Sequence, residues 1–533
     1  MAPTERTSRP TTAHRTLPSL RASTRRAMRP SGPPTDEIPI WTTPDGVDPH
    51  TALAVIDLAM RAGVAMIATG AAAADVTATV LTLTKAYGLS SVHVDVTYTS
   101  VTVSYHRGPK ADPITVLRIV RFRVQDYTRL ERLRGLIVDL AQDPVPVEEA
   151  RVRFDGVITA PHPYRRWLVA VAGGALAAGA AALVGAGVFI VALSFVTATI
   201  VGRVLNWLTG AGVASFFAQI VAAAIPTAVA TLVVVAQSAG VTFFGDVSPS
   251  LVVASGIVLL LAGLSVVGAA EDALAGYYVT AGARAFEVVV LSLGIAVGIS
   301  IVLSLGKRLD YPIAISSQTL LTDNLGVQMV CAVVISVAFA VMSYASGRAV
   351  AVAGVAGGLG WAILAVGERA LQLGAVTGSA TAALVVGFAS RLVARRLTIS
   401  ALAVTTAAIV PLLPGRMAYE GISQLVTNPD GNGFAVGVPT LVQAFGLGLG
   451  LAAGVSLGTY FAGLLVARSQ GVRPRPAAGA TLPVDPAPDA TLSSAPVLSD
   501  TGELGVVTVP AEIDEIDEAG EAGEPAREAT DRP

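Results

Sequence analysis

The chain is poor in the residues that hold most disulfides and metal sites. It has one cysteine and five histidines among 533 residues. Cys331 lies within an apolar run and can form no disulfide inside the chain. The last histidine is His162, which excludes a histidine-built metal site from the long apolar region that follows. We therefore expect neither a metal nor another cofactor.

Charge is also scarce, since 14% of the residues are charged, whereas soluble domains carry about a quarter. The shortage is concentrated between residues 168 and 466, where long apolar runs are separated by single charges or small clusters. A run of about 18 residues can cross a hydrocarbon core of about 30 Å. The sequence therefore predicts a polytopic α-helical membrane protein. We place about ten spans near residues 168–184, 187–202, 212–236, 249–270, 285–305, 327–346, 349–367, 373–393, 399–415 and 437–466.

Five segments follow from this composition. Residues 48–160 combine helical periodicity with three alternating β-branched runs, at 91–99, 101–108 and 114–121. Their order of helix, helix, three strands and helix predicts a small cytoplasmic α/β domain. The other segments are a disordered Arg/Pro-rich tail at 1–47, two five-helix membrane halves at 161–310 and 311–467, and a disordered acidic tail at 468–533.

One apolar passage occurs twice. Residues 257–263 read IVLLLAG and residues 409–415 read IVPLLPG, 152 positions apart. The triplet at 298–300, Gly-Ile-Ser, recurs at 454–456 as Gly-Val-Ser, 156 positions apart. Two pairs upstream of these have nearly the same separation, to within a residue or two: Trp207 with Trp361, and Gln219 with Gln372. These matches predict a duplicated half.

The distribution of basic residues predicts the orientation of the spans. With the N-terminus inside, the cytoplasmic ends carry ten arginines, whereas the outer loops carry four basic residues. This excess favours cytoplasmic N- and C-termini and an even number of spans. Five spans per half would make the second half enter the membrane from the opposite face. The prediction is an inverted 5+5 repeat with a substrate site near the midplane.

With the α/β domain, the spans and the repeat, the chain resembles the bacterial threonine/serine exporter family over about residues 50–466. The resemblance implies a multi-pass protein of the bacterial cytoplasmic membrane that exports threonine and serine with the proton motive force. It assigns no substrate residues. The segments that carry it are VDVTYTSVTVSYHRG (94–108), DYTRLERL (126–133), GDVSPSLVVASGIVLLLAGLSVVGAAEDALAGYYVTAGAR (245–284) and IVPLLPG (409–415).

A carrier of amino acids needs partners for a carboxylate and an ammonium group within the membrane. Interrupted helices supply free N–H groups and carbonyls for this purpose, and prolines favour such interruptions, although they also occur as tolerated kinks. Buried glutamines are ligands or hydrogen bonds between helices. The candidate substrate residues are Pro226, Gln219, Pro414, Gly415, Gln372 and Gln443.

Four charged residues are candidates for proton coupling or a gate. Glu287 follows the start of the fifth span, where a carboxylate could bind the coupling proton; alternatively, it lies near the interface and pairs with Arg284. Glu271 and Asp272 close the fourth span opposite Arg284. They form either a cytoplasmic gate that attracts an ammonium group or a solvated loop.

The leading hypothesis is a secondary transporter that exports threonine and serine with H⁺ by alternating access. Its expected partners are the amino acid, H⁺ and the lipid bilayer, with a homo-oligomer left open and no nucleic acid. A passive channel is one alternative. Another is a membrane-tethered hydrolase, which lacks a nucleophile elbow and rests on polar residues that an exposed sheet face also explains: His93, Asp95, Ser104 and His106.

Overall fold

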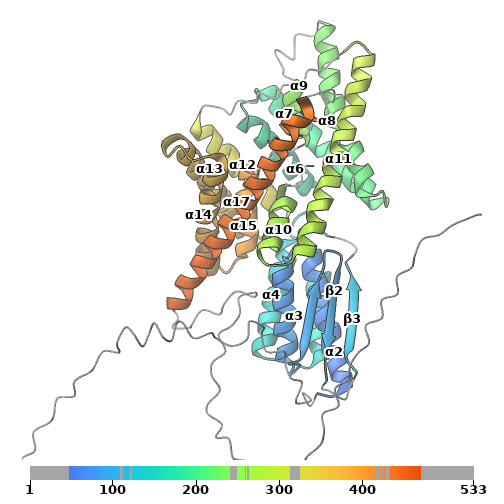
Figure 1. The fold of residues 1–533 in the computed structure, drawn as a ribbon, viewed down its shortest axis with the longest axis vertical. Coiled ribbons are helices and arrows are strands. Elements are labelled where there is room, and N and C mark those ends of the chain that lie inside the picture. The colour runs from blue at the N-terminus through green and yellow to red at the C-terminus, as the bar shows by residue number, and fades with distance from the viewer. Residues whose placement is uncertain are drawn as a thin grey trace, which may run out of the picture. The chain divides into compact units, whose positions relative to one another are not determined.

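The computed structural model is mostly helical, with one three-stranded sheet near the N-terminus (Figure 1). It describes residues 47–107, 112–120, 123–240, 249–257, 260, 263–311, 324–413, 417, 420–421, 424–425 and 432–469. The two expected tails lie outside these residues, apart from residues 47, 468 and 469.

The N-terminal region has the predicted order of helices and strands, followed by one further helix. The sheet is antiparallel, with its strands in chain order, as predicted from the three alternating runs. The Asp126 carboxylate caps the helix after the sheet by accepting the Arg129 N–H at 2.9 Å. The elements are α2 (Pro49–Ala68), α3 (Ala73–Ala86), β1 (Val92–Val96), β2 (Ser100–Tyr105), β3 (Ile114–Ile119), α4 (Tyr127–Gln142) and α5 (Val147–Thr159).

Strand alternation gives the sheet one apolar face. Val101, Val103 and Tyr105 of β2 are buried and lie on the same side of the strand. Helices α2 and α3 pack against this sheet, and α4 and α5 pack against α2 (Figure 1). The core of the N-terminal region therefore lies between the sheet and its helices.

Twelve helices follow within the described residues, one of them a single 3₁₀ turn. They are α6 (Arg166–Leu183), α7 (Val188–Gly210), α8 (Ser215–Ser238), α9 (Pro249–Ile257), α10 (Gly263–Leu274), α11 (Tyr278–Arg308), α12 (Leu325–Met342), α13 (Gly347–Ala370), α14 (Ala375–Leu397), α15 (Ala401–Ile409), η2 (Val410–Leu412) and α17 (Asn432–Ser469), where η2 is the 3₁₀ turn that directly continues α15.

Nine helices in the described part of the chain are long and apolar enough to cross a membrane. Eight of them coincide with expected spans. The ninth is α2, which the sequence placed in the α/β domain and which packs against that domain's sheet and helices. The expected span at 249–270 is divided into α9 and α10, and the span at 399–415 begins as the shorter α15 with η2.

The two halves repeat the same helix contacts. Helix α6 packs on α7, and α8 on α11; correspondingly, α12 packs on α13, and α14 on α17. Glycines let the last helix of each half approach its partner closely. Gly298 of α11 meets the backbone of Ile220 in α8, and Gly454 of α17 meets the backbone of Ala380 in α14.

This packing shows that the upstream pairing read from the sequence is wrong. Ile220 and Ala380 are 160 positions apart, whereas the tryptophan and glutamine pairs are 154 and 153 apart. Trp207 is 70% exposed near the end of α7, while Trp361 is 7% exposed within α13. The helices are offset by different amounts because the connections between them differ in length.

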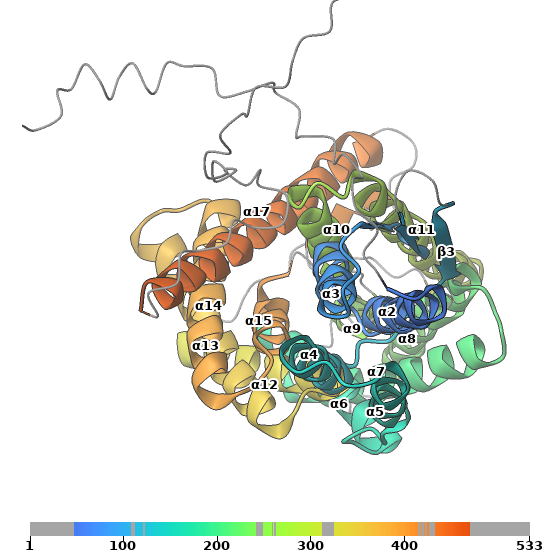
Figure 2. The same ribbon diagram turned by 90° about the horizontal axis from the view of Figure 1, so that it is seen from below.

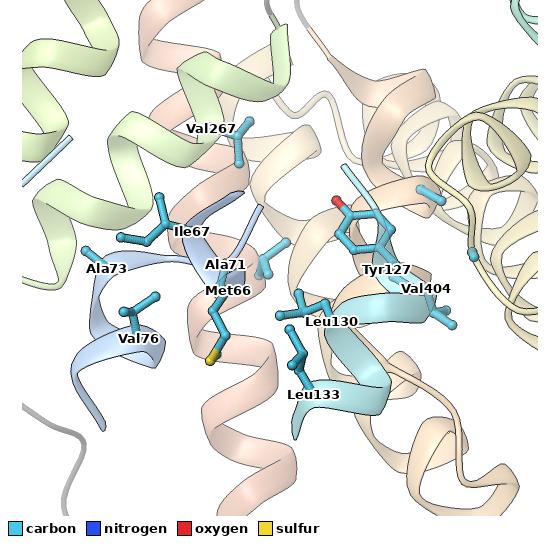
Figure 3. Close-up of a cluster of buried hydrophobic side chains, with 14 of the residues drawn as sticks. Met66, Ile67, Ala71, Ala73, Val76, Tyr127, Leu130, Leu133, Val267 and Val404 are labelled. Atoms are coloured by element: carbon cyan, nitrogen blue, oxygen red, sulfur yellow. The ribbon is translucent and has the colours of Figure 1, made fainter. Parts of the chain in front are cut away.

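Buried apolar side chains form two clusters. The first is built by α7, α8, α9 and α11 and includes Ile257 and Ile295. The second begins in the core of the N-terminal region and continues into α6, α10, α12 to α15 and α17. Figure 3 shows part of it, where Ile67 lies near Val267 of α10 and Tyr127 near Val404 of α15. The α9–α10 connection therefore crosses from one cluster to the other.

Candidate functional site

Both halves contain a helix interruption, and both interruptions fall on the repeated passage. In the first half, α9 ends at Ile257 and α10 begins at Gly263, with the buried Leu260 N–H donating to the Ile257 carbonyl at 2.8 Å between them. In the second half, α15 ends at Ile409 and is followed by the 3₁₀ turn η2 and the non-helical Leu413, and the next described residue, Met417, is helical again. Interrupted helices leave carbonyls and N–H groups without helical partners, which makes them available to a ligand.

Helix α8 passes beside the first interruption. A Cβ atom on Gly256 would lie 2.4 Å from Cβ of Pro226, so the two helices are in direct contact one residue before α9 ends. Pro226 lies inside α8, where it has no N–H to donate and so leaves the carbonyl four residues earlier, at Ala222, without its helical donor. The predicted candidate Pro226 is thus next to the break, although α8 itself continues through it.

Gln219 lies two turns before Pro226 on the same helix. It is 8% exposed, and its side-chain carbonyl oxygen, Oε1, has no hydrogen-bond partner within the described residues. A buried acceptor without a donor is costly, and such groups often mark a binding site or a bound water. At about 1.5 Å of rise per residue, Gln219 lies about 10 Å from Pro226 along α8.

The other candidate substrate residues do not join this pair. Gln372 is exposed in the turn between α13 and α14, where its side-chain nitrogen donates to the Arg369 carbonyl at 3.3 Å. Gln443 lies in α17 and is exposed. Pro414 and Gly415 lie outside the described residues.

A second group of polar residues gathers where the N-terminal region meets α10 and α11. Tyr98 occupies the tight turn between β1 and β2, and its hydroxyl donates to the Glu287 carboxylate of α11. Arg123 lies 3.6 Å above the Tyr98 ring and donates to the Tyr98 carbonyl. Burial, together with the hydrogen bond to Glu287, raises the pKa of Tyr98 to about 12, so the hydroxyl remains a donor.

Asp272, near the end of α10, is fully buried and contacts both α3 of the N-terminal region and α11. One carboxylate oxygen accepts the Ala73 N–H of α3 at 3.3 Å, and the other lies 3.4 Å from the Arg284 guanidinium of α11. Arg284 therefore pairs with Asp272, while Glu287 bonds Tyr98. Glu271 precedes Asp272 in the same turn of α10 and is partly buried.

The position of Glu287 along α11 follows from its neighbours. Gly294 meets the Phe216 carbonyl in the first turn of α8. Glu287 lies seven residues earlier, or about 10 Å toward the N-terminal region. Glu287 therefore lies in the part of α11 that contacts the N-terminal region, beyond the level at which α8 starts to pack on α11.

Tyr98 was missed in the sequence. Its partner is 189 residues away, and only the tertiary fold joins them. The available signal was an aromatic residue at the tip of a hairpin between two alternating runs.

The residues of the hydrolase alternative lie on the sheet face away from α2. The Ser104 hydroxyl pairs with the Thr115 hydroxyl of β3 at 2.9 Å. The His93 and His106 rings meet edge to face, 5.5 Å apart. These contacts are cross-strand pairs of an antiparallel sheet.

Comparisons with known proteins identify the family. Models of the threonine/serine exporter family, ThrE, match residues 57–306 and residues 328–457. The "Probable threonine/serine exporter" of Mycobacterium tuberculosis is 34% identical over 430 residues, which cover 79% of this chain and 78% of that protein. The "Threonine/serine exporter" of Corynebacterium glutamicum is 32% identical over 446 residues, covering 83% of this chain and 88% of that protein. No solved structure matches. The chain therefore belongs to the threonine/serine exporter family, a family of multi-pass membrane transporters rather than enzymes.

Proposed function

We propose that this protein exports threonine and serine across the bacterial cytoplasmic membrane as a secondary transporter, with the substrate bound between the two helix interruptions. The observation that carries the proposal is that both halves interrupt a helix at the same repeated passage. Free carbonyls at one broken end suit the ammonium group, and free N–H groups at the other suit the carboxylate.

An inverted relation between the halves is part of this proposal. Helices α6 and α12 are each the first helix of their half. The start of α6 nevertheless lies beside the end of α12, so the two helices run in opposite directions. The Tyr164 hydroxyl, before α6, donates to the Ala345 carbonyl, after α12, at 2.8 Å. Helices α11 and α17 likewise run in opposite directions (Figure 1). Opposed halves of this kind are a common basis of alternating access.

We place the N-terminal region in the cytoplasm. It packs on the end of the bundle at which α6, α11 and α13 begin. That end carries Arg165, Arg166, Arg284 and Arg348, in keeping with the excess of basic residues on the cytoplasmic side. Proton coupling is proposed as well, with Glu287 and Glu271 as the carboxylates available near this end.

The test is export of labelled threonine or serine from loaded cells, or its accumulation inside inside-out vesicles, whose outer surface is the cytoplasmic face. Cells that make the protein should hold less intracellular threonine after peptide feeding than cells without it, and a protonophore should abolish the difference. Export that proceeds against a gradient separates a carrier from a channel. Export unaffected by the protonophore would reject proton coupling, and no export of either amino acid would reject the substrate assignment.

A further inference from the structure

The domain end of the bundle has a seam between the two apolar clusters. Helix α11 contributes Ile295 and Ile299 to the cluster of the first half. The N-terminal domain and α10 belong to the other cluster, which continues into the second half. Figure 2, seen from the domain end, shows α3, α2 and α4 grouped at this end of the bundle. Helix α11 therefore meets the domain and α10 where the two cores adjoin.

Polar contacts close this seam. The Tyr98 hydroxyl donates to Glu287, and the Thr280 hydroxyl donates to the Val96 carbonyl at 3.0 Å, so the β1–β2 hairpin holds the first three turns of α11. One turn from Glu287, Arg284 pairs with Asp272 of α10. Polar contacts of this kind can be exchanged for water when a seam opens, whereas a packed apolar core resists opening.

The domain is held to the second half in a different way. The Tyr127 N–H donates to the Ser343 carbonyl at 3.0 Å, and the Thr128 N–H donates to the Tyr344 carbonyl at 3.2 Å. His162 stacks on the Tyr344 ring, 4.4 Å between centroids. These backbone bonds lie beside the continuous apolar core that joins Tyr127 to Val404. The domain should therefore move with the second half.

We propose that the N-terminal domain is the gate on its side of the membrane, and that the Tyr98–Glu287 hydrogen bond is its latch. The domain is carried by the second half, and its β1–β2 hairpin closes the seam by holding α11. When α11 swings away with α7, α8 and α9, the Tyr98–Glu287 bond breaks and the path toward the α9–α10 interruption opens. This inference rests on the proposed transport function, because a gate has meaning only for a transported solute.

The test measures movement without substrate, so that it is independent of what is exported. Spin labels are placed on Thr82 in α3 and Val289 in α11, both exposed, in a Cys331→Ala background. A second pair joins Thr82 to the exposed Arg348 of α13. In Tyr98→Phe, we expect the Thr82–Val289 distances to lengthen and broaden, while the Thr82–Arg348 distances stay unchanged.

Matched variants separate the latch from a general loss of structure. Tyr164→Phe also removes one hydroxyl, but that hydroxyl bonds the Ala345 carbonyl in the second half, so the Thr82–Val289 distances should not change. Glu287→Ala should reproduce Tyr98→Phe, whereas Glu287→Gln keeps an acceptor oxygen and should have the smaller effect. Unchanged Thr82–Val289 distances in Tyr98→Phe would overturn the proposal, as would equal changes in both label pairs.

Discussion

Gly298 of α11 packs directly on the backbone of Ile220 in α8: a Cβ atom on Gly298 would lie 2.3 Å from the Ile220 carbonyl oxygen. Gly454 of α17 stands in the same relation to the Ala380 carbonyl of α14, again at 2.3 Å. Because each contact is with a backbone carbonyl, a side chain at either glycine could be accommodated only by shifting the whole neighbouring helix.

We therefore expect Gly298→Val and Gly454→Val each to destabilise the bundle by about 1–3 kcal/mol, because the added side chain overpacks the helix contact. The measurement is thermal unfolding in detergent. Gly282 of α11 and Gly446 of α17 provide controls in the same helices, because a Cβ atom added at either would have no neighbour within 4 Å among the described residues. Alanine at either control site should be neutral or stabilising by up to about 1 kcal/mol. Equal losses at all four glycines would contradict the close approach.

The buried carbonyl oxygen of Gln219 should matter for transport rather than for stability. Because that oxygen has no partner within the described residues, Gln219→Leu removes an unsatisfied acceptor and should leave the unfolding temperature unchanged or higher. Export should fall at least tenfold if the oxygen binds the substrate. Export rate and unfolding temperature are measured on the same preparations.

Gln328 is the matched control for this change. Its side-chain oxygen accepts the Trp361 indole N–H at 3.0 Å in the buried α12–α13 contact. Gln328→Leu leaves that N–H unpaired and should cost about 1–3 kcal/mol of stability. Full export by Gln219→Leu would remove Gln219 from the substrate site.

Asp272 should be important for stability because it is a fully buried charge with a charged partner. Asp272→Asn leaves the Arg284 guanidinium unpaired, and breaking a buried pair costs roughly 3–5 kcal/mol. The exposed pair between Arg134 and Asp75 gives the comparison, since Asp75→Asn should cost less than about 1 kcal/mol. Unfolding in detergent measures both. Similar small losses for the two variants would show that Asp272 is solvated.

Alkaline pH should weaken the contact between Tyr98 and Glu287. The pKa of Tyr98 is raised from 10 to about 12, so the folded protein holds this proton more tightly than the unfolded chain does. Its contribution to stability is therefore complete below pH 10 and is lost as the pH rises toward 12. Difference absorbance of phenolate between wild type and Tyr98→Phe should show one tyrosine titrating near 12. A tyrosine titrating near 10 would contradict the buried hydrogen bond.

The sequence predicted the membrane class, most of the spans and the three-stranded sheet, because these depend on local hydrophobicity and alternation. The run IVLLLAG contains neither proline nor a charge, so hydropathy predicted one continuous span at 249–270 where the structure has α9 and α10. What the sequence did contain was the recurrence of that run, and the recurrence marks both interruptions.

The candidate site was predictable only in part. Pro226 and Gln219 lie together on α8 because they are two turns apart in one helix. Gln372 lies in the turn before α14, between the expected spans at 349–367 and 373–393, so hydropathy itself gave no reason to place it inside a helix. The partners of Glu287 and Arg284 come from the hairpin and from α10, and no local pattern predicts which carboxylate meets which donor.

Within the described residues, the β1–β2 hairpin bonds to the bundle at the beginning of α11. Under the proposed inverted arrangement, two similar halves would otherwise offer comparable entrances to both sides of the membrane. An attached domain that holds one of these entrances makes the two sides unequal. In this way a protein built from two similar halves can control the opening of the entrance on one side of the membrane and not the other.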